Sequence, residues 1–371
     1  MVLLVVSMFL ATRRRPDYVR KSVLHISYMV HIPWYMTRIL RRHGWKADYL
    51  AIGTSAVWDR CDLHWLPRLH SGLAFDEFRF IWNTVSRYEV VHLHFAMPVS
   101  AIGWELPVLK RLGRKIVVHF RGCEARNREL NIRLHPEVNI CTRCDYNARI
   151  CRDRRIALRR WLARRYADVT LVTTPDLLDF VPQGIHFPFF APEIQEAERK
   201  EAPERRTLRI VHVTNHPGIE GVDMVVPVVE KLRREGYAID YRVLRGISHD
   251  QALREMRNAD VTIGKLKMGY YANAQIESMA LGVPAITYVR PEFITDELRN
   301  SGFILTHLRD LETTLRQLVD RPELLVQKRR IARQSILRIH DNDALARRLI
   351  EIYCSAGNDG LDLRRANAVT P

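Results

Sequence analysis

The sequence predicts an α/β protein built from two doubly wound domains in tandem, and three observations lead to this prediction. The chain has 371 residues, more than one hydrophobic core usually organises, so two domains are expected. Short continuous apolar runs alternate with longer amphipathic segments, which is typical of parallel sheets made of βαβ units. A polar stretch punctuated by prolines over residues 188–206 separates two such series. Such domains face each other across a cleft, and ligands lie beyond the carboxyl ends of the strands.

The first series forms a domain over residues 21–187. Its apolar runs predict buried strands over residues 22–27, 47–53, 88–94, 115–120 and 168–173. Amphipathic segments over residues 33–43 and 104–112 predict helices between them.

The second series forms a domain over residues 207–340. The runs LRIVHV, IDYRVL, DVTIG and PAITYV predict its strands, with helices around residues 222–235 and 249–258 and another just before PAITYV. Residues 341–371 are expected to form a C-terminal helix and a tail. Residues 1–20 are expected to be a leader or an extra strand, because their apolar run is too short to span a bilayer.

Composition bounds the partners and the compartment. The 47% hydrophobic content excludes wholesale disorder. The net charge of +16 favours anionic partners such as phosphorylated small molecules or an acidic membrane surface; it permits nucleic acid, but no recognised nucleic-acid module is present. Six cysteines, four of them clustered, favour a reducing compartment over a disulfide scaffold. We therefore expect a cytoplasmic protein that can contact the inner face of the membrane peripherally.

One motif resembles a known family. The segment IESMALGVPAITY is similar to the signature of the large retaining glycosyltransferase family that includes sucrose synthases and phosphatidylinositol mannosyltransferases. The segments VVHLH, VVHFRGCEAR, IVHVTNHPGIEGVD and ADVTIGKLKMGYY follow the family's order, so the resemblance covers about residues 20–355. It implies a GT-B fold, with a nucleotide-sugar donor on the C-terminal domain, a glycan, lipid-linked or small-molecule acceptor on the N-terminal one, and no cofactor for the chemistry.

The resemblance assigns Glu277 to the donor. A carboxylate accepts two ribose hydroxyls at once, and backbone amides of Asn273, Ala274 and Gln275 at a helix N-terminus can face the pyrophosphate. The alternative is an acid that merely stabilises the helix dipole. Gly282 is expected to end this helix in the left-handed conformation.

The chain departs from the family pattern at two donor-side positions. Gly269 stands where relatives commonly carry a glutamate eight residues before Glu277, and Glu220 stands where they carry a phosphate-binding lysine. We predict that Lys265 and Lys267 take over the cationic role; the alternative is that both are solvated loop lysines. The other predicted donor-side residues are Asn215, His216 and Arg245.

On the N-terminal side the candidate catalytic residues are His94, His119, Arg121 and Glu124. Arg121 stands where relatives often have histidine and stays protonated, so it can neutralise phosphate or fix a hydroxyl but cannot be a base. His94 and His119 lie at strand ends and are expected to orient the acceptor, unless they are structural. Arg126 matches the family pattern and is assigned to the acceptor side.

A cysteine-rich insertion over residues 123–151 predicts a metal site. Cys123, Cys141, Cys144 and Cys151 follow the spacing C-x17-C-x2-C-x6-C, and four thiolates can complete a tetrahedral zinc site. His135 is an alternative fourth ligand. Reduced thiols, a disulfide and an iron–sulfur cluster remain alternatives.

Seven arginines lie between Arg152 and Arg165, interleaved with apolar residues. This pattern predicts a helix that packs a narrow apolar stripe on its own domain, or an electropositive surface for an anionic membrane or acceptor.

Three functions fit these features. The first is a retaining glycosyltransferase, the second a nucleotide-sugar epimerase with the same two-domain appearance, and the third a catalytically silent binding or scaffold protein.

Overall fold

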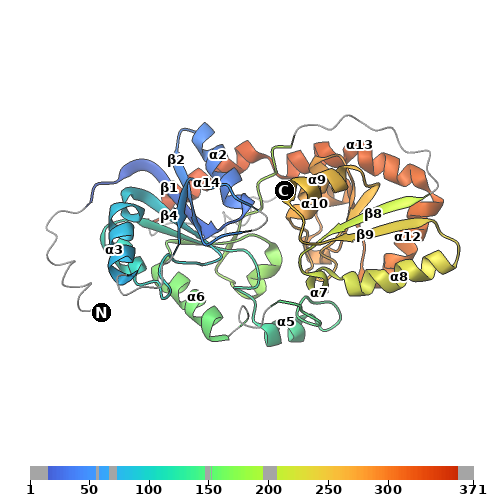
Figure 1. The fold of residues 1–371 in the computed structure, drawn as a ribbon, viewed down its shortest axis with the longest axis horizontal. Coiled ribbons are helices and arrows are strands. Elements are labelled where there is room, and N and C mark those ends of the chain that lie inside the picture. The colour runs from blue at the N-terminus through green and yellow to red at the C-terminus, as the bar shows by residue number, and fades with distance from the viewer. Residues whose placement is uncertain are drawn as a thin grey trace.

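The computed structural model describes residues 16–55, 58–66, 73–146, 151, 153–194 and 207–357. Two α/β domains lie beside each other, the N-terminal one on the left and the C-terminal one on the right of Figure 1. Most of the expected leader, the polar stretch over 195–206 and the tail over 358–371 lie outside the described residues. No helix in the described part of the chain is both long and apolar enough to span a bilayer.

The N-terminal domain is built on a parallel sheet with the order β3-β2-β1-β4-β5-β6-β7. This is the doubly wound arrangement, in which strand order reverses beside β1 and ligands collect there. The five predicted strands are confirmed, and the sequence missed the short edge strands β3 and β7. The strands are β1 (Val19–Tyr28), β2 (Lys46–Ile52), β3 (Leu63–Trp65), β4 (Tyr88–His94), β5 (Lys115–Phe120), β6 (Val169–Val172) and β7 (Ile185–His186).

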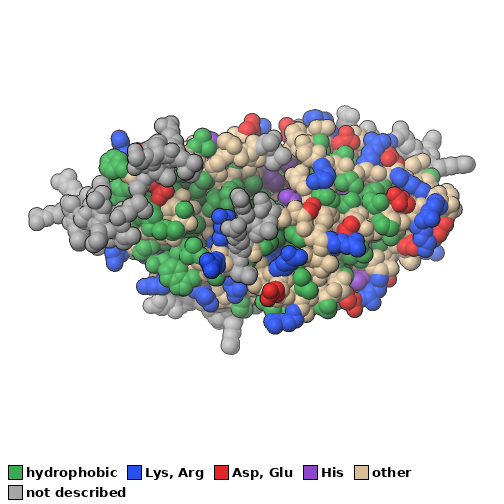
Figure 2. Space-filling model, turned by 60° about the horizontal axis from the view of Figure 1, so that its bottom comes forward, with side chains coloured by type: hydrophobic (Ala, Val, Ile, Leu, Met, Phe, Trp, Pro, Cys, Tyr) green, Lys and Arg blue, Asp and Glu red, His purple; other side chains and the backbone are tan. Residues whose placement is uncertain are grey.

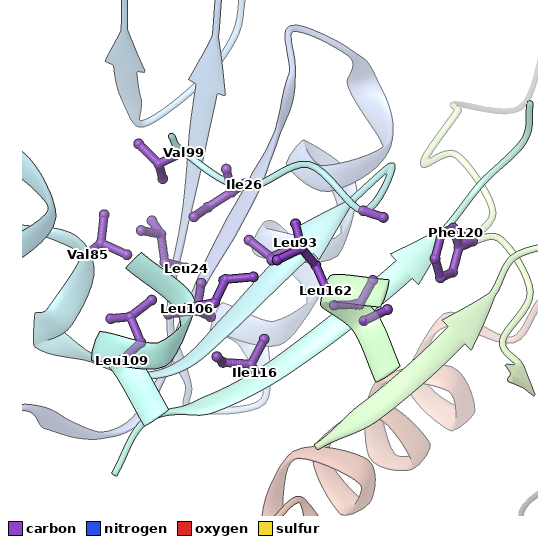
Figure 3. Packing of buried hydrophobic residues seen from close by; sticks show 14 of the residues in the cluster. Leu24, Ile26, Val85, Leu93, Val99, Leu106, Leu109, Ile116, Phe120 and Leu162 are labelled. Atoms are coloured by element: carbon purple, nitrogen blue, oxygen red, sulfur yellow. The ribbon is translucent and has the colours of Figure 1, made fainter. Parts of the chain in front are cut away.

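Helices follow these strands as βαβ connections require. Those of the first domain are α2 (His31–Arg42), α3 (Leu73–Asn83), α4 (Glu105–Arg111), α5 (Arg128–Leu134) and α6 (Asp153–Tyr166). Figure 3 shows how one face of the sheet is covered: Leu24 and Leu93 from the strands meet Leu106 of α4 and Leu162 of α6, all buried.

The C-terminal domain is built on a second parallel sheet with the order β12-β11-β10-β8-β9. Its strands are β8 (Leu208–Val213), β9 (Ile239–Leu244), β10 (Val261–Ile263), β11 (Ala285–Thr287) and β12 (Phe303–Leu305). Its helices are α7 (Pro217–Glu220), α8 (Val222–Arg234), α9 (His249–Arg257), α10 (Asn273–Ala280), α11 (Asp296–Arg299), α12 (Leu311–Asp320) and α13 (Pro322–Ile339). The α/β class, with two doubly wound domains, is therefore confirmed.

The segments that connect the two domains pack into the domain cores, which the sequence did not indicate. Phe189 packs in a core cluster of the C-terminal domain, whereas Phe190 packs in a cluster of the N-terminal domain. The last helix, α14 (Asn342–Ser355), returns to the N-terminal domain, where Leu349 and Tyr353 are buried beside α2. The chain therefore crosses between the domains twice, and the second crossing closes the first domain's core.

Candidate active site

Glu277 lies at the interface between the two domains. Helix α10 begins at Asn273, so Glu277 stands in its second turn, beyond the reach of a helix-dipole cap. Its side chain is buried, and Oε1 lies 2.9 Å from Nε2 of His249 and 3.4 Å from Nε2 of His31. Because His31 begins α2 of the N-terminal domain and His249 begins α9 of the C-terminal one, the carboxylate is contacted from both sides of the interface.

The pKa values of the two histidines are shifted in opposite directions. Burial is the largest single influence on His249 and disfavours its protonated form, but the hydrogen bond to Glu277 and the charge attraction of Glu277 together outweigh burial, so the pKa of His249 is raised. Burial also dominates at His31, and there it lowers the pKa below its ordinary value despite Glu277. Two imidazoles whose pKa values are shifted in opposite directions therefore contact a single carboxylate oxygen.

Aromatic rings close one side of this carboxylate. The ring of Trp58 lies 5.8 Å from that of His31 and 5.9 Å from that of His249, and Tyr35 lies 5.7 Å from His31. Figure 2 shows histidine side chains in the hollow between the two halves. The site thus combines a buried charge with flat ring faces, a setting suited to a ligand with hydroxyl groups and an aromatic base.

Asn273, Ala274 and Gln275 form the first turn of α10, and contact between their backbone amides and a ligand stays a prediction. Gln275 is buried, and its Oε1 accepts the backbone N–H of Ala272 at 3.1 Å, while Asn273 and Ala274 remain half-buried at the first turn. Gly282, with φ of 82°, ends the helix in the left-handed conformation, which confirms the predicted stop.

The two lysines predicted to neutralise phosphate are both in ion pairs. Nζ of Lys265 pairs with the carboxylate of Glu220, which occupies the position of the family's lysine. Nζ of Lys267 is buried and lies 2.7 Å from Oδ1 of Asp223 and 3.0 Å from a backbone carbonyl. Two lysine ammonium groups therefore lie close together at this loop, but each forms an ion pair with a carboxylate.

The other three predicted donor-side residues lie on neighbouring loops. Oδ1 of Asn215 accepts the backbone N–H of Gly246 at 3.1 Å, and Arg245 beside it is exposed. The ring of His216 packs on Tyr146 of the insertion, with ring centres 3.9 Å apart.

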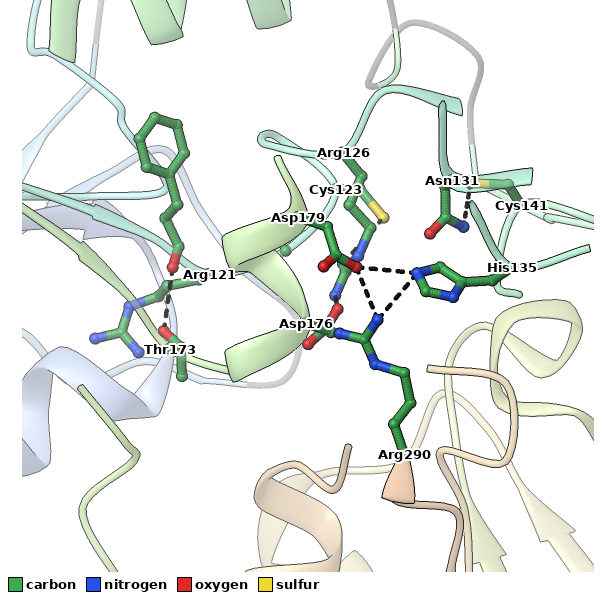
Figure 4. A network of polar contacts seen from close by, with 12 residues as sticks. Arg121, Cys123, Arg126, Asn131, His135, Cys141, Thr173, Asp176, Asp179 and Arg290 are labelled. Atoms are coloured by element: carbon green, nitrogen blue, oxygen red, sulfur yellow. Dashed lines mark hydrogen bonds and ion pairs between the residues drawn. The ribbon is translucent and has the colours of Figure 1, made fainter. Parts of the chain in front are cut away.

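Arg290 lies against Gly269 and leaves no room there for a side chain. A Cβ added to Gly269, which has φ of 84°, would lie only 2.7 Å from Cγ of Arg290. The guanidinium of Arg290 extends to the N-terminal domain, where NH1 lies 2.8 Å from Oδ2 of Asp179 and 3.0 Å from Nε2 of His135, as Figure 4 shows. An arginine that bridges the domains therefore fills the space that a side chain at position 269 would need.

The loop after β5 carries the candidate residues of the acceptor side. Glu124 is buried and accepts the backbone N–H groups of Arg121 and, at 3.0 Å, Gly122, so it holds the loop itself. Arg121 donates from Nε to Nδ1 of His94 at 2.9 Å. Burial lowers the pKa of Arg121 to about 9, so the side chain stays charged at neutral pH. Arg126 is buried in an ion pair with Asp176 (Figure 4).

His94 and His119 do not line an open surface. They are 0% and 1% exposed, and burial lowers the pKa of each well below its ordinary value. Nε2 of His94 lies 3.0 Å from Nδ1 of His25, and Nε2 of His119 lies 2.9 Å from the hydroxyl of Thr173. The expected direct contact with an acceptor is therefore revised: His94 reaches the loop through Arg121, and His119 is part of the core.

The four cysteines of the insertion come together at the lower edge of the interface. Cys141 is buried beside Ile140 and Ile219, and Cys123 and Cys144 pack against this group. The thiols of Cys123 and Cys151 are hydrogen-bonded to each other. This contact, with help from nearby Arg126, lowers the pKa of Cys123 to about 7. His135 instead contacts Asp179 and Arg290.

In the described part of the chain, two groups of three side chains have their potential metal-ligand atoms within 4.8 Å of one another. Among these described residues the cysteines do not form such a group. These groups are His25 with His92 and His94, and His31 with His249 and Glu277.

The arginine-rich helix α6 packs its apolar stripe on its own domain. Ile156, Leu162 and Ala163 are buried, whereas Trp161 is 49% exposed. The predicted packing is confirmed for the described residues 153–166, and contact with a membrane stays a prediction.

Sequence reasoning missed His31, His249, Asp176, Asp179 and Arg290. His31 and Arg290 each follow closely after a strand that ends at the interface, a position that could have flagged them. The pairing of His31 with Glu277 depends on how two domains meet, which no local pattern encodes.

Solved structures share this architecture over nearly the whole chain. Sucrose-phosphate synthase from Thermosynechococcus elongatus matches with a TM-score of 0.60 at 14% identity, covering 91% of this chain and 99% of that one. Anabaena HepE in complex with UDP-glucose matches with a TM-score of 0.61 at 10% identity, covering 90% and 99%. The catalytic domain of starch synthase IV from Arabidopsis thaliana, bound to ADP and acarbose, matches with a TM-score of 0.59 at 10% identity, covering 90% and 99%. These likenesses show the GT-B fold. No family model and no curated protein matches the chain.

Proposed function

We propose that this chain is a glycosyltransferase that moves a sugar from a nucleotide-diphosphate sugar to a glycan, lipid-linked or small-molecule acceptor, with retention at the anomeric carbon. One observation carries the proposal: a buried carboxylate, Glu277, stands in the second turn of α10 at the domain interface. Both histidine contacts use Oε1, and a carboxylate has about four acceptor positions on its two oxygens. Such a group suits the two neighbouring hydroxyls of a ribose.

The start of α10 completes the donor site. Asn273 and Ala274 lie in the first turn of α10, where backbone amides favour negative charge, whereas the backbone N–H of Gln275 already donates to the carbonyl of Ala272 at 3.1 Å. A pyrophosphate placed there would put its nucleoside toward Glu277 and its sugar toward the loop over residues 264–272. Solved structures of the same fold hold UDP-glucose and ADP, which supports a nucleotide ligand for this one.

In this proposal the transfer occurs on the front face of the sugar, and the departing phosphate assists removal of the acceptor's proton. The protein then supplies position and charge stabilisation rather than a side-chain base. This suits a loop after β5 whose arginines, Arg121 and Arg126, stay charged, beside strands whose histidines, His94 and His119, are buried.

The leaving diphosphate requires cations, and we assign them to Lys265 and Lys267. Their present partners, Glu220 and Asp223, keep the loop neutral. A pyrophosphate would compete with these acids for the two ammonium groups, so the acids set the affinity for the donor.

Because Lys265 pairs with Glu220, we expect substitutions of these two residues to change the affinity for the donor in opposite directions. Glu220→Gln is expected to tighten donor binding about five- to tenfold, because removing a like charge beside the phosphates contributes on the order of 1 kcal/mol. Lys265→Ala is expected to weaken binding by at least as much. Isothermal titration with the donor measures both, and Lys231→Ala, which breaks an exposed ion pair with Glu312, serves as the control. A change of the same sign in both variants would contradict the assignment.

A panel of nucleotide sugars tests the function itself. We expect at least one UDP- or ADP-sugar to raise the melting temperature of the full chain, since a ligand that binds only the folded state stabilises it by mass action. The same sugar is expected to be hydrolysed slowly without an acceptor. If a sugar binds and is epimerised instead, the chain is an epimerase. If none binds and none is consumed, the catalytic proposal is wrong.

A further inference from the structure

The insertion between β5 and α6 has a cysteine at each end and two in its middle. Cys123 follows β5 on the loop of Arg121 and Glu124, and Cys151 lies two residues before the start of α6. Between them the chain forms the short helix α5, and residues 135–146 contain neither helix nor strand. The structure nevertheless folds this segment so that Cys123, Cys141 and Cys144 pack in one cluster, and it brings Cys123 into contact with Cys151.

Hydrogen-bond donors point at the sulfurs. Nδ2 of Asn131 lies 3.3 Å from Sγ of Cys141, and the backbone N–H of Tyr146 lies 3.5 Å from Sγ of Cys144. The guanidinium of Arg126 lies 4.0 Å from Sγ of Cys123. A sulfur that accepts N–H groups is prepared to carry negative charge, and bonds of this kind orient metal-bound thiolates.

The backbone between Cys141 and Cys144 forms a turn that would suit binding of both thiols to one ion. Arg143 has φ of 59°, in the left-handed region that non-glycine residues rarely adopt. The side chain of Asn139 holds this turn by accepting the backbone N–H groups of Cys141 at 3.0 Å and Thr142 at 2.8 Å. Such a turn brings the second thiol of a C-x2-C pair back toward the first.

The tip of the insertion rests on the C-terminal domain. Gly218 donates its backbone N–H to Asp145 at 3.2 Å, and NH1 of Arg143 lies 3.3 Å from Asp223. The contact is so close that a Cβ at Gly218 would lie 2.3 Å from the carbonyl oxygen of Arg143. In Figure 1, α5 and α7 lie next to each other at the bottom of the interface. Through this contact the insertion reaches α7, which ends at Glu220.

We propose that Cys123, Cys141, Cys144 and Cys151 bind a structural zinc ion, and that this ion fixes the insertion as a clasp between the loop after β5 and residues 216–223, which comprise α7 and the start of α8. Four thiolates are the donor set of structural zinc sites, and each thiol releases its proton as the ion binds. Zn–S bonds of about 2.3 Å would draw the sulfurs to about 3.8 Å from one another. The irregular backbone over residues 135–146 can supply that movement. The proposal goes beyond glycosyl transfer and holds whether or not the chain transfers sugars.

Metal content and thiol reactivity test the site in the unmodified full chain. After expression with added zinc and purification under reducing conditions, we expect about one zinc per chain by mass spectrometry of the metal. A thiol reagent should then react readily with Cys61 and Cys354, the two cysteines outside the cluster, and with all six after a strong chelator removes the ion. Zinc-free protein, iron in place of zinc, or a thiol count that the chelator does not change would each overturn the proposal.

Cysteine substitutions inside and outside the cluster distinguish loss of the zinc site from a general effect of removing a cysteine. Cys141→Ser and Cys144→Ser are expected to lose the zinc, whereas Cys61→Ser and Cys354→Ser are expected to keep it. Cobalt reconstitution gives a readout independent of activity, because thiolate ligands produce charge-transfer absorption that should appear in the unmodified chain and in the two controls only. Hydrogen exchange should rise over residues 135–146 and 216–223 when the chelator is added. Zinc retained in both cluster variants would refute the ligand set, and unchanged exchange over residues 216–223 would refute the clasp.

Discussion

Glu277→Gln is expected to weaken binding of the nucleotide-sugar donor by about 30- to 1,000-fold. The substitution keeps the shape of the side chain but removes the charge. Hydrogen bonds to a charged acceptor contribute about 1.5 to 3 kcal/mol each, so the loss from a paired ribose contact should be about 2 to 4 kcal/mol. Titration calorimetry with the sugar identified by the panel measures the change, and donor hydrolysis should fall in parallel.

A matched variant and a fold check make this result decisive. Glu292→Gln removes a carboxylate that is 57% exposed in the same domain, so it should leave donor affinity unchanged. Circular dichroism and the melting temperature without ligand show whether Glu277→Gln remains folded. A folded variant that binds the donor as tightly as the original chain would refute the role of this carboxylate, and with it the observation on which the proposed function rests.

Stability is expected to fall steeply as the pH drops from about 6.5 toward 4. Burial lowers the pKa of His25 to about 3 and that of His186, His212 and His340 to about 4. An unfolded chain binds these protons near pH 6.5, whereas the folded chain does not, so acid favours the unfolded state. Each histidine contributes up to about 1.4 kcal/mol per pH unit within this window. Several together approach the whole stability of a typical protein, about 5 to 15 kcal/mol.

One buried acid acts in the opposite direction. Burial raises the pKa of Glu105 to about 7, so the folded chain holds a proton there that the unfolded chain releases above about pH 4.5. This group makes the fold less stable as pH rises toward 7, but it is one acid against several histidines. The net expectation is therefore acid lability.

Denaturant unfolding at pH 7, 6 and 5 measures the effect. His212→Gln is expected to reduce the pH dependence by about one proton, because His212 is buried against the hydroxyl of Tyr241. His43→Gln is the control, since His43 is partly exposed and faces Asp343 at the surface. A free energy of unfolding that stays level between pH 7 and 5 would contradict the prediction.

Local sequence pattern was sufficient for most of the fold. Apolar runs such as LRIVHV are buried on both faces of a parallel sheet and therefore mark their strands without reference to the rest of the chain. The edge strands β3, β7 and β12 escaped prediction because each has only two or three residues. The stop at Gly282 was predictable because it depends on backbone conformation at one residue.

The site was only partly predictable. The signature around Glu277 identified the carboxylate, and the spacing of the cysteines marked the insertion. The buried state of His94 and His119 was not evident, because polar residues that end adjacent strands can face either the cleft or the core. The ion pair between Lys265 and Glu220 was not evident either, since it joins the loop after β10 to α7, which are far apart in the sequence.

By itself, then, the sequence determined two doubly wound domains, the strand ends at which side chains gather, and a carboxylate, Glu277, in the helix that precedes the strand PAITYV. Only the tertiary structure decided that His31 meets Glu277 across the interface, that Arg290 fills the space beside Gly269, and that α14 returns to the first domain. The physical reason is the range of each interaction. Strand and helix formation depend on neighbours within a few residues, whereas contacts between domains depend on how two finished surfaces pack.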